Sequence, residues 1–140
     1  MRTNSLILDT GGWLLALAGV RAYAAALEAS HRPIVPGLVL AEMDWHLRSR
    51  RADMRRLMRE IGRGGYVYEP PSRADLTRAD EIDAKFRDRA LGLVDATIVA
   101  LAERLNVPRV LTTDSDFAAA RFGSGWKRAF QLVVPLSARP

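Results

Sequence analysis

Five acidic residues lie where a carboxylate is costly unless it has a role. They are Asp9, Glu42, Asp95, Asp114 and Asp116. Asp9 directly follows three apolar residues, and Asp114 and Asp116 follow a second apolar run, so we expect all three just beyond buried strands. Asp95 has apolar residues at i+3, i+4 and i+7, and Glu42 shares a helix face with Leu38 and Trp45, so we expect both acids to point inward.

Each acid also has a purely structural explanation. Asp95 could cap the helix that we expect over residues 95–106. Asp114 and Asp116 could be turn residues, and Glu42 could lie half-exposed at a helix edge. Asp9 is the exception, because a carboxylate that ends a buried strand is seldom only a turn residue.

These explanations weaken when the acids are considered together. Parallel strands would bring Asp9, Asp95 and Asp114 to the same edge of a sheet. Two like charges about 4 Å apart repel by about 4 kcal/mol at an effective dielectric constant of about 20. Raised pKa values or a bound divalent cation would relieve that repulsion. Because the donors are oxygens and the chain has no cysteine, the pattern favours Mg²⁺ or Mn²⁺ over zinc.

Short apolar runs alternate with helical patterns along the chain, and this alternation positions the acids. We predict helices over residues 10–19, 21–30, 36–46, 51–63, 72–89 and 95–106, and strands over residues 5–8, 33–36, 66–68, 109–112 and 130–134. Such alternation predicts a three-layer α/β/α sandwich with a mainly parallel central sheet. In this fold class, ligands bind at the carboxyl ends of the strands.

Length and composition set the outer limits. The 140 residues predict a single domain over 1–140, large enough to fold without disulfides. The net charge is +5, and Lys85 and Lys127 are the only lysines, so nearly all positive charge is arginine. Outside the five acids, 21 basic residues face 11 acidic ones, which favours a polyanionic partner. No apolar run reaches membrane-spanning length, so we expect a cytoplasmic protein without membrane association.

Four segments that contain these acids resemble the motifs of a known family. They are residues 6–10, 38–42, 94–102 and 111–117. In order and spacing they resemble the four motifs of PIN-domain ribonucleases, in particular the VapC-type toxins of prokaryotic toxin–antitoxin pairs. The resemblance covers residues 6–134, and its last two motifs are the most specific.

The resemblance implies a function and a set of site residues. Asp9, Glu42, Asp95 and Asp114 would be the catalytic acids that hold Mg²⁺ or Mn²⁺, with Asp116 as a further metal ligand or support. Thr113 matches the hydroxyl residue that precedes the fourth acid, whereas Gly11 replaces a commoner small hydroxyl residue. The implied activity is metal-dependent hydrolysis of RNA phosphodiester bonds, leaving a 5′-phosphate and a 3′-hydroxyl. The alternative is a catalytically silent PIN-like module that binds RNA or protein.

The resemblance also implies partners. The substrate would be a structured RNA of the tRNA or ribosomal class, and a cognate VapB-type antitoxin would cover the early helices and the acids. A homodimer is expected. Arg48, Arg51 and Arg55 belong to a basic helix series that is either a solvated face or a weak track for the RNA backbone. We expect Trp13 and Trp45 to pack between helices and His46 to be half-buried.

Overall fold

Five parallel strands form the central sheet in a computed structural model that describes residues 5–138. Their order is β3–β2–β1–β4–β7, and neighbouring strands pair in parallel throughout. The strands are β1 (Ile7–Leu8), β2 (Ile34–Pro36), β3 (Val67–Glu69), β4 (Arg109–Leu111) and β7 (Gln131–Leu132). The predicted parallel α/β sheet is therefore confirmed.

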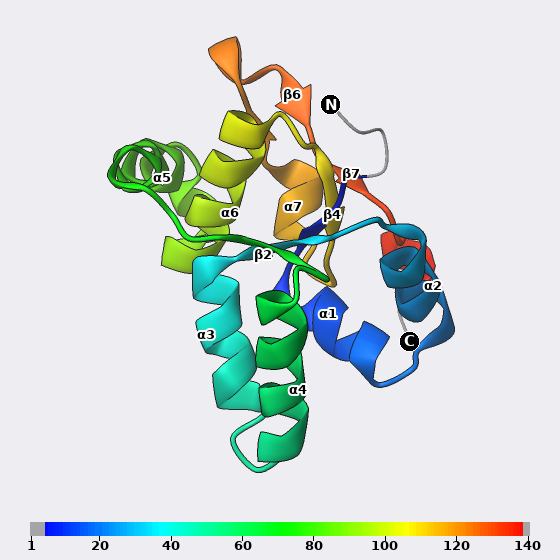
Figure 1. The fold of residues 1–140 in the computed structure, drawn as a ribbon. Coiled ribbons are helices and arrows are strands. Elements are labelled where there is room, and N and C mark those ends of the chain that lie inside the picture. Colours follow the sequence, from blue (N-terminus) through cyan, green and yellow to red (C-terminus); the bar gives the residue numbers. More distant parts are fainter. Residues whose placement is uncertain (1–4, 139–140) are drawn as a thin grey trace.

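Helices cover the sheet on both sides and extend beyond its edge. Figure 1 shows α5 and α6 on one side, α1 and α2 on the other, and α3 and α4 running down and back up below the sheet. The longer helices are α1 (Thr10–Leu17), α2 (Arg21–Ala29), α3 (Gly37–His46), α4 (Arg51–Gly62), α5 (Arg73–Lys85) and α6 (Gly92–Leu105). This layering confirms the predicted three-layer arrangement.

The centre of the sheet is the centre of the core. Ile7 on β1 pairs with Ile34 on β2 and with Val110 on β4, and all three side chains are buried. Apolar, β-branched residues fit this position, because a parallel strand under two helical layers is covered on both faces. Trp13 on α1 is fully buried as predicted. The core thus fixes the carboxyl end of β1, where Asp9 follows.

The predicted helix boundaries at Arg89 and Asp95 differ from the structure. The helix expected to run through Arg89 ends at Lys85, because a 3₁₀ turn (η1, Arg87–Arg89) follows and Ala90 and Gly92 adopt positive φ angles of 50° and 79°. Helix α6 begins at Gly92, three residues before the predicted start, so Asp95 does not cap it. Because Gly is a weak helix former, the sequence pattern placed the start at the first strong signal.

Several short elements between Asp116 and Ala138 were not predicted. Helix α7 (Asp116–Ala119) follows β4, and the antiparallel pair β5 (Arg121–Phe122) and β6 (Arg128–Ala129) precedes β7. Between these two strands lies a 3₁₀ turn, η2 (Ser124–Trp126), and a further turn, η3 (Leu136–Ala138), follows β7. Two-residue strands carry too little periodicity to be recognised in a sequence.

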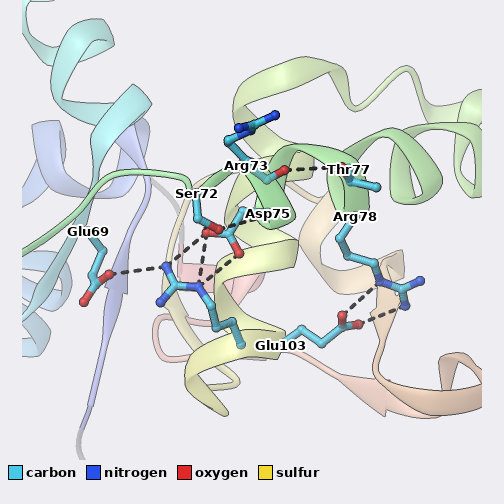
Figure 2. A network of polar contacts seen from close by, with 8 residues as sticks. Glu69, Ser72, Arg73, Asp75, Thr77, Arg78 and Glu103 are labelled. Carbon is cyan, nitrogen blue, oxygen red and sulfur yellow. Dashed lines mark hydrogen bonds and ion pairs between the residues drawn. The ribbon is translucent and has the colours of Figure 1, made fainter.

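A charged network joins α5 to α6 (Figure 2). Asp75 is 4% exposed and closes a capping box with Ser72 at the start of α5. Arg104 on α6 donates to both carboxylate oxygens of Asp75, and Arg78 makes two hydrogen bonds with Glu103. Burial opposes ionisation of Asp75, but the bonds from Arg104 and the Ser72 amide outweigh it and lower its pKa. The network therefore holds α6, which carries Asp95, against its neighbour.

Among the described residues, no single helix is long and apolar enough to cross a membrane. Helices α1 and α2 reach that length and composition only as a pair, and they are bent by 102° at their junction.

Candidate active site

Asp9 lies at the carboxyl end of β1 and is 7% exposed. It caps α1, since its Oδ1 accepts a hydrogen bond of 2.9 Å from the Thr10 amide. Its Oδ2 accepts a bond of 2.6 Å from the hydroxyl of Thr112, which follows the neighbouring strand β4. Both carboxylate oxygens are thus held in place, Oδ1 by the residue after Asp9 itself and Oδ2 by a residue that follows β4.

Thr112 also positions Asp114. The Asp114 amide donates to the Thr112 hydroxyl oxygen at 3.0 Å, and Asp114 Oδ1 accepts from the Asp116 amide at 2.8 Å. One buried threonine side chain therefore links the acids that follow β1 and β4. Thr112 was not predicted from the sequence, although its place between an apolar run and the acidic turn indicates it.

Asp95, Asp114 and Asp116 come together at this edge of the sheet. Each offers a carboxylate oxygen within 4.8 Å of the others, and each side chain is half-buried. Asp95 reaches the group from the first turn of α6. We call these three residues the acidic trio.

Glu42 and Asp9 lie beside the acidic trio. The Thr10 hydroxyl donates to Glu42 Oε1 at 2.5 Å, so α3 is tied to the start of α1. The charge of Glu42 acts on both Asp9 and Asp95, and that of Asp114 acts on them as well. All five acids named from the sequence therefore gather at one sheet edge, with Thr10 as a second positioning residue that the sequence analysis missed.

The environment raises the pKa of two of these acids. Burial raises the pKa of Asp9 to about 6, with further contributions from Glu42 and Asp114, while the hydrogen bond from Thr112 opposes the shift. Burial, followed by the charges of Asp9, Asp114 and Glu42, raises the pKa of Asp95 to about 8. The site therefore disfavours the ionised form of Asp95, and to a smaller extent that of Asp9, when no cation is bound.

The donor set fits a hard divalent cation. All of the ligand atoms are carboxylate oxygens, which Mg²⁺ and Mn²⁺ prefer. A dication would favour the ionised form of Asp9 and Asp95, and so relieve the repulsion described above. Arg89 on η1 offsets part of the charge, since its Nη1 lies 3.5 Å from Asp116 Oδ1. This arginine was not identified from the sequence.

Gly11, which stands where the family commonly has a small hydroxyl residue, lies against Thr113. A Cβ atom added at Gly11 would overlap the Thr113 hydroxyl oxygen, so the first turn of α1 and the acidic turn touch here. The glycine that interrupts the family pattern therefore makes room for the hydroxyl residue of the fourth motif. Thr113 itself is half-buried beside Asp114.

The three arginines named from the sequence lie between the end of α3 and the middle of α4. Arg51 pairs with Asp44 at 2.7 Å, and Arg48 lies against the ring of Trp45, whereas Arg55 is exposed. The prediction that Trp45 packs between helices is wrong, because its side chain is 63% exposed. His46 is exposed rather than half-buried.

Comparison with known families identifies the class of protein. The PIN domain model matches residues 6–123, which is most of the chain. This chain therefore belongs to the PIN-domain family, as its four motifs indicated.

Two relatives place it more narrowly. The chain is 31% identical over 91 residues to Ribonuclease VapC26 of Mycobacterium tuberculosis, an alignment that covers 63% of this chain and 67% of the relative. It also resembles the crystal structure of VapC20 of the same organism, which is described as a Sarcin-Ricin loop cleaving toxin. That match has a TM-score of 0.65 at 21% identity and covers 82% of this chain and 94% of the other, so it supports the fold. The resemblance to VapC-type toxins is confirmed.

Proposed function

We propose that this protein is a metal-dependent endoribonuclease of the VapC toxin type, with its active centre at the carboxyl ends of β1 and β4. The observation that carries the proposal is the meeting of the acidic trio with Asp9 and Glu42 at that edge. The membership in the PIN family and the similarity to a VapC ribonuclease support the same activity.

The ligands would be Asp95, Asp114 and Asp116, with Asp9 completing the set. When bound, Mg²⁺ or Mn²⁺ would lower the pKa of a coordinated water and neutralise charge on the phosphate. Thr112 would favour the ionised form of Asp9 against its burial and would orient it, because the Thr112 hydroxyl donates to Oδ2. Glu42, whose Oε1 accepts a bond from the Thr10 hydroxyl, would be a further ligand, and any of these carboxylates that the metal does not fully engage would accept the proton of the attacking water.

The substrate would be a structured RNA of the tRNA or ribosomal class. The basic surplus outside the acids supports a polyanionic substrate, because phosphate contacts dominate the affinity of nucleic-acid binding. Partners in this proposal are a VapB-type antitoxin, which would suppress the activity, and a second copy of the chain in a homodimer.

The test is cleavage of structured RNA by the purified protein. We expect cleavage with Mn²⁺ or Mg²⁺, none with EDTA, and none by Asp9→Asn or Asp95→Asn protein whose circular dichroism matches wild type. Asp80→Asn, which removes an exposed carboxylate from α5, is the matched control and should cleave normally. Wild-type activity in either site variant would refute the site, and a wild type that binds RNA but never cleaves would support the silent-module alternative.

The partner proposal is tested separately. Expression of the chain alone should arrest growth, and co-expression with a small reading frame adjacent to its gene should restore it. Continued arrest in the presence of every adjacent small reading frame would refute an antitoxin encoded beside the toxin.

A further inference from the structure

An exposed tryptophan lies next to the proposed active centre. Trp45 on α3 is 63% exposed, whereas Trp13 is fully buried and Trp126 is half-buried. A large aromatic side chain in water forgoes the stabilisation that burial would give it. The fold of this chain therefore does not explain why position 45 carries an indole.

The helix geometry places Trp45 beside the acids. It lies three residues after Glu42, and side chains with that spacing are neighbours on a helix, with Cβ atoms about 5–6 Å apart. Val39 and Met43 bury the core face of α3, while Glu42 lies at the edge of that face and bonds to Thr10. Trp45 thus lies on the same edge of α3 as Glu42, about one turn further along the helix, and its side chain is exposed.

Arg48 forms a stack with this ring. Its guanidinium carbon lies 3.9 Å from the centroid of the Trp45 ring, and its Nη1 donates to the Trp45 carbonyl at 2.8 Å. The carbonyl bond holds the guanidinium over the ring, so the cation and the ring form one positively charged stack. Most of the indole stays exposed and is free to contact another planar group.

We propose that Trp45 and Arg48 form a nucleobase-stacking site, which holds an unpaired RNA nucleotide next to the phosphate that is cut. This inference rests on the ribonuclease activity proposed above. Proteins recognise single-stranded RNA by stacking bases on aromatic rings and on arginine planes. The residues beside Trp45 favour RNA over an apolar protein partner, because Asp44, His46 and Arg48 are all exposed and polar.

The binding test uses tryptophan fluorescence as its readout. A single-stranded RNA of about eight nucleotides is titrated into the protein with EDTA at low salt, and its affinity is measured in parallel by anisotropy of a labelled copy. RNA should quench the wild type and the Trp126→Phe variant. The Trp45→Phe variant should lose the quenching yet bind with near wild-type affinity, because phenylalanine still stacks.

Removing the ring should weaken binding without changing the chemistry. We expect Trp45→Ala to raise the Kd and the KM about 5- to 100-fold, as for the loss of one stacked base, with kcat nearly unchanged. Tyr68→Ala, which removes another exposed aromatic side chain from β3, is the matched control and should alter neither. Arg48→Ala should weaken binding and also reduce its dependence on salt.

Three results would overturn the stacking site. The first is a Trp45→Ala protein with wild-type Kd and KM, and the second is RNA binding that leaves the fluorescence of Trp45 unchanged. The third is a Trp45→Ala protein that changes from dimer to monomer while its RNA affinity is unaltered, which would assign the ring to a subunit interface. Failure of the ribonuclease proposal is distinct, because there the wild type would not cleave with Mn²⁺ although Trp45 reports RNA binding.

Discussion

Replacing Asp95 by asparagine should stabilise the metal-free protein while it removes the activity. Burial and the charges of Asp9, Asp114 and Glu42 all disfavour an ionised Asp95. Asparagine has nearly the same shape and no charge, and its amide can still donate to the neighbouring carboxylate of Asp114. Asp95 therefore lowers the free energy of unfolding of the metal-free protein. Replacing it by asparagine should raise that free energy.

The magnitude follows from the pKa of Asp95, which rises from 3.8 to about 8 on folding. Each unit corresponds to about 1.4 kcal/mol, so the full shift would be worth about 6 kcal/mol for a fully buried group. Asp95 is only half-buried, and solvent screening reduces the effect, so we expect about 2–3 kcal/mol.

The direction of the Asp95 pKa shift determines the pH range in which stability changes. Below about pH 4 the carboxyl is protonated in both the folded and the unfolded protein, and Asp95 contributes its full stability. Between about pH 4 and pH 8 the unfolded chain releases the proton while the folded protein keeps it, so wild-type stability falls. The advantage of Asp95→Asn should therefore grow across this window and level off above about pH 8.

Urea denaturation in EDTA at a series of pH values measures this difference. Asp80→Asn provides the control, because its exposed carboxylate should give a difference that is flat with pH. Mn²⁺ at about 100 times its Kd should stabilise the wild type by about 3 kcal/mol and Asp95→Asn by much less. A stability difference that does not change between pH 4 and pH 9 would show that burial and the neighbouring acids do not raise the pKa of Asp95.

Three further predictions test residues that the tertiary structure identified. Thr112→Val removes the hydroxyl that lowers the pKa of Asp9, so the acid limb of the pH–rate profile for RNA cleavage should move to higher pH, and an unmoved limb would argue against this role. Gly12→Ala should cost about 1–3 kcal/mol in urea denaturation, because a Cβ there would overlap the backbone carbonyl of Leu111, whereas Gly62→Ala meets open space among the described residues and should not destabilise. Asp75→Ala removes the Asp75 half of the capping box and the buried partner of Arg104, and because Arg104 is 39% exposed and keeps Glu69, it should cost about 2–3 kcal/mol; a loss below about 0.5 kcal/mol would show that the network in Figure 2 is dispensable.

Much of the architecture could be predicted from local pattern. The runs before Asp9 and Asp114 were long enough to indicate strands, and the alternation with helices indicated a parallel sheet. Boundaries were less predictable where conformation depended on single residues. The positive φ angles of Ala90 and Gly92, which end one helical region and begin the next, belong to two exposed residues and follow no repeating pattern.

The exposure of Trp45 illustrates a different limit. Helical spacing places its ring and the carboxylate of Glu42 on one edge of α3, and both side chains were expected to point inward. Helix spacing gives relative directions around the axis, but only the neighbouring elements decide which of those directions faces the core. Here Val39 and Met43 define the core face, and Trp45 lies outside it.

By itself, the sequence determined which acids belong together, because a parallel sheet collects the residues that follow its strands at one edge. Only the tertiary structure decided how those acids are held: Thr112 bridges Asp9 and Asp114, Thr10 holds Glu42, and Arg89 approaches Asp116. Thr112 and Asp9 are 103 residues apart in the chain, and hydrogen bonds between such residues leave no periodic trace in a sequence. Directional contacts of about 3 Å depend on where the folded backbone brings two side chains, and that placement is set by the packing of the whole core.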